Sequence, residues 1–338
     1  MDINFIEKAK RLHRETFVAD AHYDLLNFVV SKRIEGGRSD VIASDYLGRL
    51  RSGGIDLLIC SIFLDDCYVP EMSLRRALDQ ISCLHEEMDQ CGDIALCRST
   101  KEIKTAAQAG KIAILLSLEG VEPIGNDLYM LRIFYELGVR GVGLTWNRRN
   151  YAADGCSVVR EKTGYGLTDF GVSLVKKCEK LGMYIDVSHL NDAGFQSLCE
   201  IAACPFMASH SNSRALTPVA RNLTDAQILT IAENGGVIGL NSCGNFVRLT
   251  GSKRAGAHEM AVHASHIKEL VGAEHICLGF DFCDEMRSNI GQAPLDSINF
   301  YDHSSELTAS LLEEGFSESE VTGIMGKNLM SYLERVIG

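Results

Sequence analysis

The sequence has no apolar run near the ~20 residues that a membrane-spanning helix needs. Residues 1–17 mix charged and apolar side chains at helical spacing, without the uninterrupted apolar core of a signal peptide. None of the 12 cysteines forms a C-x-x-C pair, and several lie inside apolar runs, as Cys60 and Cys178 do. Thiols in such surroundings behave as small hydrophobic groups. We therefore expect reduced cysteines, a cytoplasmic protein and no membrane partner.

Positive charge is scarce, because 33 Lys and Arg stand against 45 Asp and Glu, for a net charge of -12. Binding to nucleic acid needs clustered Lys and Arg that neutralise phosphates, so we expect no such partner. The glycines of GGVIGLN (235–241) do not form the G-x-G-x-x-G pattern of a dinucleotide site. Linker-like and low-complexity stretches are also lacking, and we expect one domain over residues 1–338.

Short β-type runs recur along the chain, and most precede a longer segment with helical periodicity. The runs are FVADAHYDL (17–25), IDLLICSIF (55–63), IAILLSLEG (112–120), GVRGVGLTW (138–146), GMYIDVSHL (182–190), PFMASHSN (205–212), GGVIGLN (235–241) and HICLGFDF (275–282). Helices are expected over 73–90, 167–181, 192–203, 224–234 and 258–271. Eight strands alternating with helices predict an α/β fold, a (β/α)8 TIM barrel, with extra closing helices after Phe282.

Metal-binding residue types close five of these eight runs, and barrel active sites lie at the C-terminal ends of the strands. The residues are His22, Asp24, Glu119, His189, His210 and Asp281. Three histidines and three carboxylates exceed the needs of one catalytic zinc and suit two ions that share a bridging carboxylate. Coordination would also stabilise the alternating Asp20, His22 and Asp24 of the first run.

Each of these residues alone has a simpler explanation. A single histidine at a strand end is commonly a hydrogen-bonded structural residue, and Asp24 alone could cap a helix or turn. Their joint occurrence at matching strand ends favours metal binding. His258, His263 and His266 are spaced as on a helix before the last strand. We expect them on a solvated outer helix face, with a second metal site as the alternative.

The order and spacing of these motifs resemble the membrane (renal) dipeptidase family, the zinc dipeptidases of the amidohydrolase-like barrels. The resemblance covers nearly the whole chain, through DAHYD (20–24), SLEG (117–120), DVSH (186–189), SHSNSRAL (209–216), RNLTD (221–225) and GFDF (279–282). It implies two zinc ions per chain, one held by His22, Asp24 and Glu119 and the other by Glu119, His189 and His210.

The resemblance also implies roles in catalysis and substrate binding. Asp281 would take a proton during attack and return it to the leaving amine, with Glu119 as the second catalytic residue. Arg221 falls where the family carries an arginine that holds the substrate carboxylate. Trp146 and Asn241, at the ends of two strand runs, are further expected substrate-binding residues.

Two positions depart from the family pattern. Trp146 of LTWN stands where the renal enzymes place a histidine beside the substrate, which affects substrate range and stabilisation of the transition state. The neighbouring Arg148 and Arg149 could supply a compensating cation or be solvated loop residues. DFCD places Cys283 where the family usually has an aspartate. Cys283 lies outside the expected ligands, so we expect the metals to remain.

The expected function is hydrolysis of dipeptides and other short peptides with a free C-terminal carboxylate, including those with a D-residue at the C-terminal position. One alternative is another metal-dependent amide or cyclic-amide hydrolase. The other is a metal-retaining binding protein without peptidase activity. Nothing supports the membrane anchor or disulfides of the renal enzymes, and a bacterial-type relative, either monomeric or a homodimer, is expected.

Overall fold

The computed structural model describes residues 3–158 and 165–338, and the chain folds into two compact units. Unit 1 comprises Met1–Tyr23, Ala43–Leu58 and Ser209–Tyr332, and unit 2 comprises Asp24–Ile42, Ile59–Ala208 and Leu333–Gly338. Each unit therefore combines segments that are distant in the sequence. The expectation of one domain over residues 1–338 stays a prediction.

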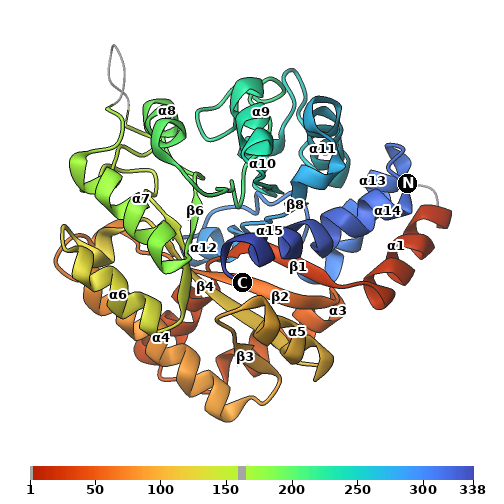
Figure 1. Cartoon of the computed structure of the whole chain (residues 1–338). Coiled ribbons are helices and arrows are strands. Elements are labelled where there is room, and N and C mark those ends of the chain that lie inside the picture. Colours follow the sequence, from red (N-terminus) through yellow and green to blue (C-terminus); the bar gives the residue numbers. More distant parts are fainter. Residues whose placement is uncertain (1–2, 159–164) are drawn as a thin grey trace. The chain divides into compact units, whose positions relative to one another are not determined.

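Unit 1 contains the first strand and most of the C-terminal helices. Its elements are α1 (Ile3–Glu15), β1 (Val18–Tyr23), α3 (Leu47–Ser52), α9 (Asp225–Glu233), β7 (Ile238–Leu240), α10 (Gly244–Val247), α11 (Ala257–Val271), η5 (Ala273–His275), β8 (Ile276–Leu278), α12 (Asp284–Asn289), η6 (Tyr301–His303), α13 (Ser305–Glu313), α14 (Glu318–Thr322) and η7 (Gly323–Lys327). Within this unit, α13 packs against both α1 and α11 (Figure 1).

Unit 2 contains the central part of the chain. Its elements are α2 (Leu25–Val30), η1 (Ser31–Glu35), η3 (Asp66–Tyr68), α4 (Ser73–Gln90), β3 (Ile94–Leu96), α5 (Thr100–Gln108), β4 (Ile112–Glu119), η4 (Glu122–Ile124), α6 (Leu128–Glu136), β5 (Val139–Gly143), α7 (Asp169–Leu181), β6 (Tyr184–Asp186) and α8 (Asp192–Ile201). Three elements cross the boundary between the units, namely η2 (Ile42–Tyr46), β2 (Ile55–Ile62) and α15 (Asn328–Val336).

The strands of each unit pair in parallel. Unit 1 has the order β2-β1-β8-β7 and unit 2 the order β6-β5-β4-β2, with β3 beside β4, because β2 continues from unit 1 into unit 2. Asp20 of β1 lies opposite Leu278 of β8, and Glu119 of β4 lies opposite Gly143 of β5. Every residue of β1 and β4 is buried, as expected for parallel strands covered on both faces.

Most of the predicted elements are present. Helix α4 has the predicted bounds, and the other predicted helices agree to within two residues at each end. Helix α7 begins at a Thr168 hydroxyl cap and ends at Gly182, whose positive φ of 70° favours glycine. The short strand β3 was not among the predicted runs.

The predicted strand PFMASHSN (205–212) is wrong. No named strand forms here, and bridge residues are confined to Met207, which pairs in parallel with Asp186, and Ala208. The hydrogen bonds beside the Met207 bridge are Met207 N to Ile185 O at 3.0 Å and Val187 N to Met207 O at 2.8 Å. Pro205 has no N–H to extend this ladder in its direction.

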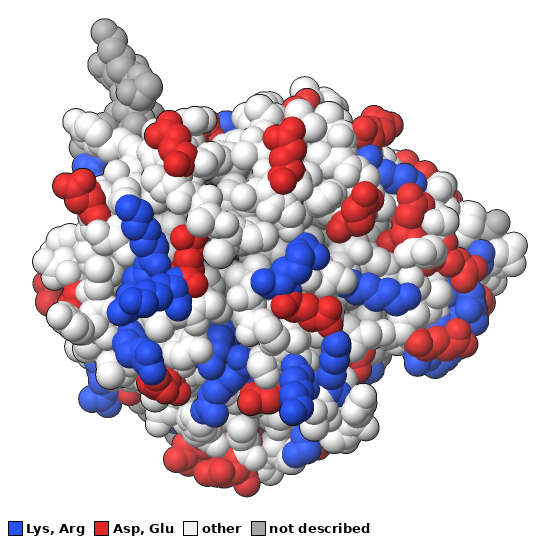
Figure 2. Space-filling view, in the orientation of Figure 1, with Lys and Arg blue, Asp and Glu red and all other residues white. Residues whose placement is uncertain are grey.

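The described surface carries charges of both signs. On the face drawn in Figure 2, Asp and Glu side chains lie among the Lys and Arg side chains. Within residues 3–158 and 165–338, no helix combines the length and apolar character that crossing a membrane requires. No disulfide joins cysteines in this described part of the chain.

Candidate metal centre and catalytic site

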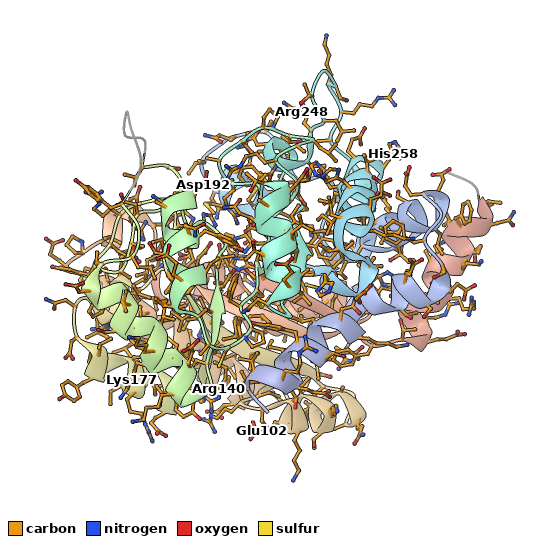
Figure 3. All side chains as sticks on the ribbon, turned by 45° about the horizontal axis from the view of Figure 1, so that its top comes forward. Glu102, Arg140, Lys177, Asp192, Arg248 and His258 are labelled. Atoms are coloured by element: carbon orange, nitrogen blue, oxygen red, sulfur yellow. The ribbon has the colours of Figure 1, made fainter. Side chains whose placement is uncertain are left out.

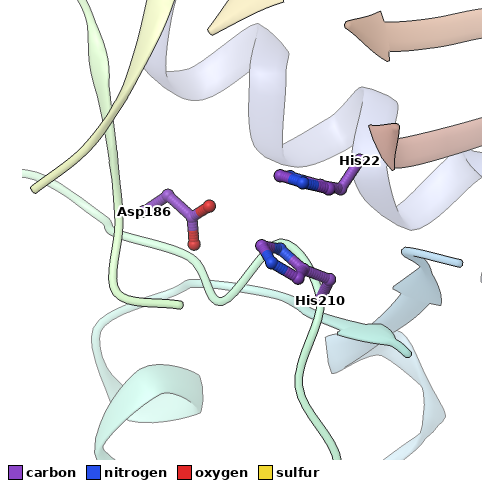
Figure 4. A group of neighbouring side chains, drawn as sticks. All are labelled: His22, Asp186 and His210. Atoms are coloured by element: carbon purple, nitrogen blue, oxygen red, sulfur yellow. The ribbon is translucent and has the colours of Figure 1, made fainter. Parts of the chain in front are cut away.

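In unit 1, two histidines and one aspartate converge near the ends of the paired strands β1 and β8. His22 lies near the end of β1 and Asp281 follows β8, where Asp281 N donates to His22 O over 3.2 Å. The Nε2 atom of His22 lies 3.8 Å from Asp281 Oδ1, and that of His210 lies 4.0 Å from Asp281 Oδ2. The two imidazole rings stack with their centroids 3.6 Å apart (Figure 4).

A serine orients both rings. Ser209 Oγ lies 2.6 Å from His210 Nδ1 and 3.5 Å from His22 Nδ1. Because Nδ1 of each ring faces this hydroxyl, the Nε2 atoms are left on the side of Asp281. Both histidines are buried, with 1% and 0% of their surface exposed. Sequence reasoning did not select Ser209, although it directly precedes His210 and partners of metal-ligating histidines commonly fix their orientation.

Asn241 and Arg221, two expected substrate-binding residues, also lie in unit 1. Asn241 is fully buried, and its side-chain nitrogen donates to Asp281 Oδ2 over 2.8 Å. Arg221 is buried and donates to Ser211 Oγ at 2.9 Å and to the carbonyl oxygen of His210 at 2.7 Å. Its Nε atom is buried and has no hydrogen-bond partner among the described residues. The Nε–H donor of this guanidinium therefore remains available for another group.

In unit 2, a glutamate and a histidine form the corresponding pair. Glu119 closes β4 and His189 follows β6, with His189 Nε2 only 3.0 Å from Glu119 Oε1. The Nδ1 atom of His189 lies 2.8 Å from the side-chain oxygen of Asn147. An amide oxygen only accepts hydrogen bonds, so Nδ1 carries the proton. In the neutral imidazole, the lone pair of Nε2 then faces Glu119.

Unit 2 contains two further aspartates, Asp24 and Asp186. Asp24 directly precedes α2, but its side chain makes no hydrogen bond that caps this helix. The helix-cap explanation of Asp24 is therefore not supported. Asp186, labelled in Figure 4, closes β6 and accepts a hydrogen bond of 2.9 Å from Ser188 N. Sequence reasoning did not select Asp186, although it is the acidic residue of the DVSH motif.

The backbone of two predicted site residues is strained. His189 has φ of 67° and Asp281 has φ of 53°, in the left-handed region that residues other than glycine rarely adopt. This conformation costs roughly 1–2 kcal/mol per residue, and such residues cluster at functional sites. Both residues turn the chain directly after a strand end, which indicates that side-chain placement outweighs local backbone preference there.

Asp20 alternates with His22 but has a different environment. Its carboxylate accepts hydrogen bonds from the Tyr301 hydroxyl, from Phe280 N at 3.0 Å and from His22 N at 3.3 Å. Burial raises the pKa of Asp20 to about 6, and these hydrogen bonds act in the opposite direction. Coordination of a metal is therefore not needed to explain the burial of this first carboxylate of the run.

Trp146 is half-buried and lies beside the histidine of unit 2. Its ring centroid is 6.1 Å from that of His189 and 5.2 Å from that of Phe63. The Arg148 guanidinium lies 5.1 Å from the centre of the indole. A hollow of about 430 Å³ is lined by Trp146, Arg148 and their neighbours. The position of the indole is consistent with a wall of a substrate pocket.

Both neighbouring arginines form ion pairs, and Arg149 is also exposed to solvent. Arg148 donates to Glu122 Oε1 and to Asp66 Oδ1, both at 2.7 Å. Arg149 forms an ion pair with the buried carboxylate of Asp154. The charge of each guanidinium is thus already balanced within unit 2, which argues against a compensating cation beside Trp146.

Cys283, the second departure from the family pattern, belongs to a turn in unit 1. Cys283 N donates to Asp296 Oδ2 at 2.8 Å, and its thiol lies 3.1 Å from Asp296 Oδ1. Burial, together with the nearby charge of Asp284, raises the pKa of Asp296 to about 7. Asp284 in turn accepts hydrogen bonds from the backbone N–H groups of residues 295 and 296. The carboxylates of Asp284 and Asp296 therefore bind the two ends of the loop between these residues.

The three histidines of α11 do not share one environment. His258 is exposed at the start of this helix (Figure 3) and lies 3.2 Å from Glu314 Oε1. His266 is partly exposed and pairs with Asp225 Oδ1 at 2.8 Å. His263 is fully buried, accepts a hydrogen bond from Ser213 N at 3.1 Å and contacts Val247 O at 3.1 Å. The predicted solvated face is wrong for His263, which faces the interior of unit 1.

The donor atoms of both units fit a divalent cation. In unit 1, separations of 3.8 and 4.0 Å between imidazole nitrogens and Asp281 are too long for hydrogen bonds. Both imidazole nitrogens are of the type that ligates zinc, and Asp281 lies near both of them. In unit 2, His189 Nε2 and Glu119 Oε1 lie 3.0 Å apart, and both atoms are of types that ligate zinc.

The sequence matches the model of the membrane dipeptidase family (peptidase family M19) over residues 6–337. A dipeptidase, VerJ of Clonostachys rogersoniana, is 28% identical over 348 residues, covering 98% of this chain and 87% of that protein. An uncharacterized protein of Acinetobacter calcoaceticus is 37% identical over 181 residues, and this match covers 53% of the chain but only 58% of that protein's length.

Solved structures show the same fold. A metallopeptidase of family M19, dipeptidase AC, superposes with a TM-score of 0.85 at 28% identity, covering 96% of this chain and 99% of that one. A metallopeptidase from Rhodobacter sphaeroides, bound to a phosphinate mimic of the dipeptide L-Ala-D-Ala, gives 0.84 at 27% identity, with 95% and 99% covered. The fold class is therefore the predicted α/β, amidohydrolase-like TIM barrel.

Proposed function

This chain belongs to the membrane dipeptidase family, peptidase family M19, and on this premise we propose that it is a binuclear zinc dipeptidase. Its substrates would be dipeptides and other short peptides with a free C-terminal carboxylate. The observation that carries the proposal is that buried His22, His189 and His210 each direct Nε2 toward a carboxylate. The dipeptide mimic bound by the Rhodobacter sphaeroides relative supports this substrate class, including a D-residue at the C-terminal position.

His22, Asp24 and Glu119 would hold one zinc ion, and Glu119, His189 and His210 the other, as the resemblance to the family implies. The family match over residues 6–337 includes all five residues, which supports these ligand sets. Zinc held there supplies Lewis acidity toward a substrate carbonyl and an attacking water.

The protein's own groups would bind the substrate and move the proton. Asp281 would accept the proton of the attacking water and pass it to the leaving amine, and its carboxylate is oriented by Asn241 over 2.8 Å. Arg221 would bind the substrate's C-terminal carboxylate, because a guanidinium can donate two parallel hydrogen bonds to such a group. Trp146 would form an apolar wall beside the substrate side chain. A cytoplasmic location and a homodimer stay predictions from the sequence.

The test combines metal analysis with a substrate panel. Protein purified in zinc-replete buffer should contain up to two ions per chain by elemental analysis. It should hydrolyse L,L- or L,D-dipeptides, lose this activity on chelation and recover it when zinc returns. His189→Ala should weaken one ion more than the other, because the two ligand sets share only Glu119.

The same panel separates the alternatives. A zinc-loaded protein that cleaves cyclic amides but no dipeptide would instead be a different amide hydrolase. A zinc-loaded protein that binds dipeptides without cleaving any of them would be a binding protein. Absence of any ion near His22 and His210 under zinc-replete conditions would refute the metal centre together with the mechanism.

A further inference from the structure

We propose that Asn147 is a positioning residue that holds the imidazole of His189 in the tautomer and orientation that a metal ligand needs. This inference rests on the proposed metal centre and adds a residue to it. The side-chain oxygen of Asn147 lies 2.8 Å from His189 Nδ1. Since that oxygen can only accept, a proton is fixed on Nδ1, and in the neutral ring the lone pair is left on Nε2.

A second donor fixes the amide itself. Cys156 Sγ donates to the same oxygen of Asn147 over 3.1 Å. With a thiol and an imidazole N–H both directed at this atom, the amide is held with its oxygen, and not its nitrogen, toward His189. Asn147 therefore has a defined orientation before any ligand binds.

The backbone of the same segment also pairs with the backbone at His189. Cys156 N donates to the carbonyl oxygen of His189 over 2.7 Å, and Ser157 N donates to that of Asn147 over 3.1 Å. Gly155 pairs with Leu190 in an antiparallel bridge. A Cβ atom on Gly155 would lie 2.1 Å from Trp146 O, so this close approach requires glycine. Segment 146–157 thus holds both the side chain and the backbone of His189.

The strained backbone of His189 and the contact with Asn147 both act on the orientation of the imidazole ring. The positive φ of this residue aims its ring at Glu119, and Asn147 prevents the ring from turning or changing tautomer. Groups that bind the second nitrogen of a metal-ligating histidine typically contribute 10–100-fold to metal affinity. Because Trp146 directly precedes Asn147, the substrate wall and the ligand support lie on the same segment.

The experiment measures zinc affinity by competition with a chromogenic chelator. Asn147→Ala should weaken one of the two bound ions by about 10–100-fold. Asn147→Asp keeps an acceptor oxygen at this position and should bind zinc as well as the native protein or more tightly. Asn150→Ala is the matched control, because Asn150 bonds Leu144 O and Ala152 N in the same segment without contacting His189. It should lower the melting temperature but leave both zinc affinities unchanged.

Two outcomes would overturn the proposal. One is an Asn147→Ala protein that binds both ions like the native chain, and the other is an Asn147→Asp protein as impaired as the alanine variant. The tautomer of His189, read from imidazole ¹⁵N shifts of the metal-free protein, tests the same inference without zinc. We expect the Nδ1–H form in the native chain and its loss in Asn147→Ala. If the native protein bound no zinc, the proposed function would fail, and an Nε2–H form would still independently refute the role of Asn147.

Discussion

The side-chain amide of Asn241 connects Asp281 to the backbone of the following loop. Its nitrogen donates to Asp281 Oδ2 over 2.8 Å, and its oxygen accepts a hydrogen bond of 2.7 Å from Cys243 N. Both ends of this fully buried amide are therefore used inside unit 1. Orientation of the Asp281 carboxylate is the role that these contacts support, whereas direct contact with substrate stays a prediction.

Replacing Asn241 should therefore reduce kcat more than it changes KM. In Asn241→Ala, an Asp281 oxygen loses its amide partner, which typically costs ~1–3 kcal/mol for a buried group. This corresponds to a loss of about 5–150-fold in kcat. Steady-state kinetics on a cleaved dipeptide, at equal zinc content, would measure this loss of kcat. Asn328→Ala removes two amide hydrogen bonds to backbone carbonyls elsewhere in unit 1 and should leave kcat unchanged. Equal losses in both variants would contradict the specific role of Asn241.

Arg221→Lys should reduce kcat/KM for dipeptides with a free C-terminus. Arg221 is not needed to cap the following helix, because α9 begins with a capping box formed by Thr224 and Gln227. Lysine keeps the charge but cannot donate two parallel hydrogen bonds to a carboxylate, so we expect a loss of roughly 10–100-fold from ~1.5–3 kcal/mol.

A dipeptide with an amidated C-terminus distinguishes carboxylate binding by Arg221 from a structural role of this residue. Arg221 also supports the backbone of His210, and a general disturbance would slow both substrates alike. We expect the native protein to prefer the free carboxylate and Arg221→Lys to lose most of that preference. An unchanged preference, with normal zinc content, would show that Arg221 does not bind the carboxylate.

The sequence predicts strands well where the apolar run is long and poorly where pairing is short. Strands β2 and β4 are long apolar runs, and both were found close to their predicted positions. Strand β3 has only three residues, and its existence depends on pairing with β4. The segment 205–212 has the composition of a strand but has bridge residues only at Met207 and Ala208. Pairing partners distant in the sequence decide both cases, and no local pattern reports them.

In the candidate site, residue type and strand-end position were enough to select the expected site residues from the sequence. The residues that support them could not be selected in this way. His22 and Asp281 could be selected because they close strand runs. Their separations fit the proposal, but those distances depend on the pairing of β1 with β8. Ser209 and Asn147 are common polar residues whose partners are set by the folded chain. His263 was placed on the wrong face because helical spacing does not show which face of a helix is covered.

Trp146→Phe should change substrate preference more than metal content. The indole lies beside His189 and Phe63, but it is not among the proposed ligands. Phenylalanine keeps an apolar wall of smaller size, so zinc content should remain normal while the ranking of dipeptides by side-chain size shifts. Trp146 is the only tryptophan of the chain, and a bound phosphinate dipeptide analogue should change its fluorescence. An analogue that binds at saturation without altering the emission would place the indole outside the pocket.

The buried His263 should make the stability of the protein depend on pH below neutrality. Burial lowers its pKa from 6.5 to about 4, although its contact with Val247 O acts in the opposite direction. The unfolded chain therefore binds a proton near pH 6.5 that the folded protein does not accept until about pH 4. The stabilisation is fully present above pH 6.5 and is lost as the pH falls toward 4, by roughly 3 kcal/mol at most.

His263→Gln tests this dependence by removing the titrating group. The variant should be less stable at pH 7, because Ser213 N loses its acceptor, but its free energy of unfolding should fall less between pH 6.5 and pH 4. Urea unfolding of both proteins, at equal metal content, gives the difference in slope.

The raised pKa of Asp296 produces an opposite slope in both proteins and cancels in that difference. His258→Gln, at an exposed position of the same helix, is the control that should keep the native slope. If His263→Gln kept it too, the buried imidazole would not be the origin of the pH dependence.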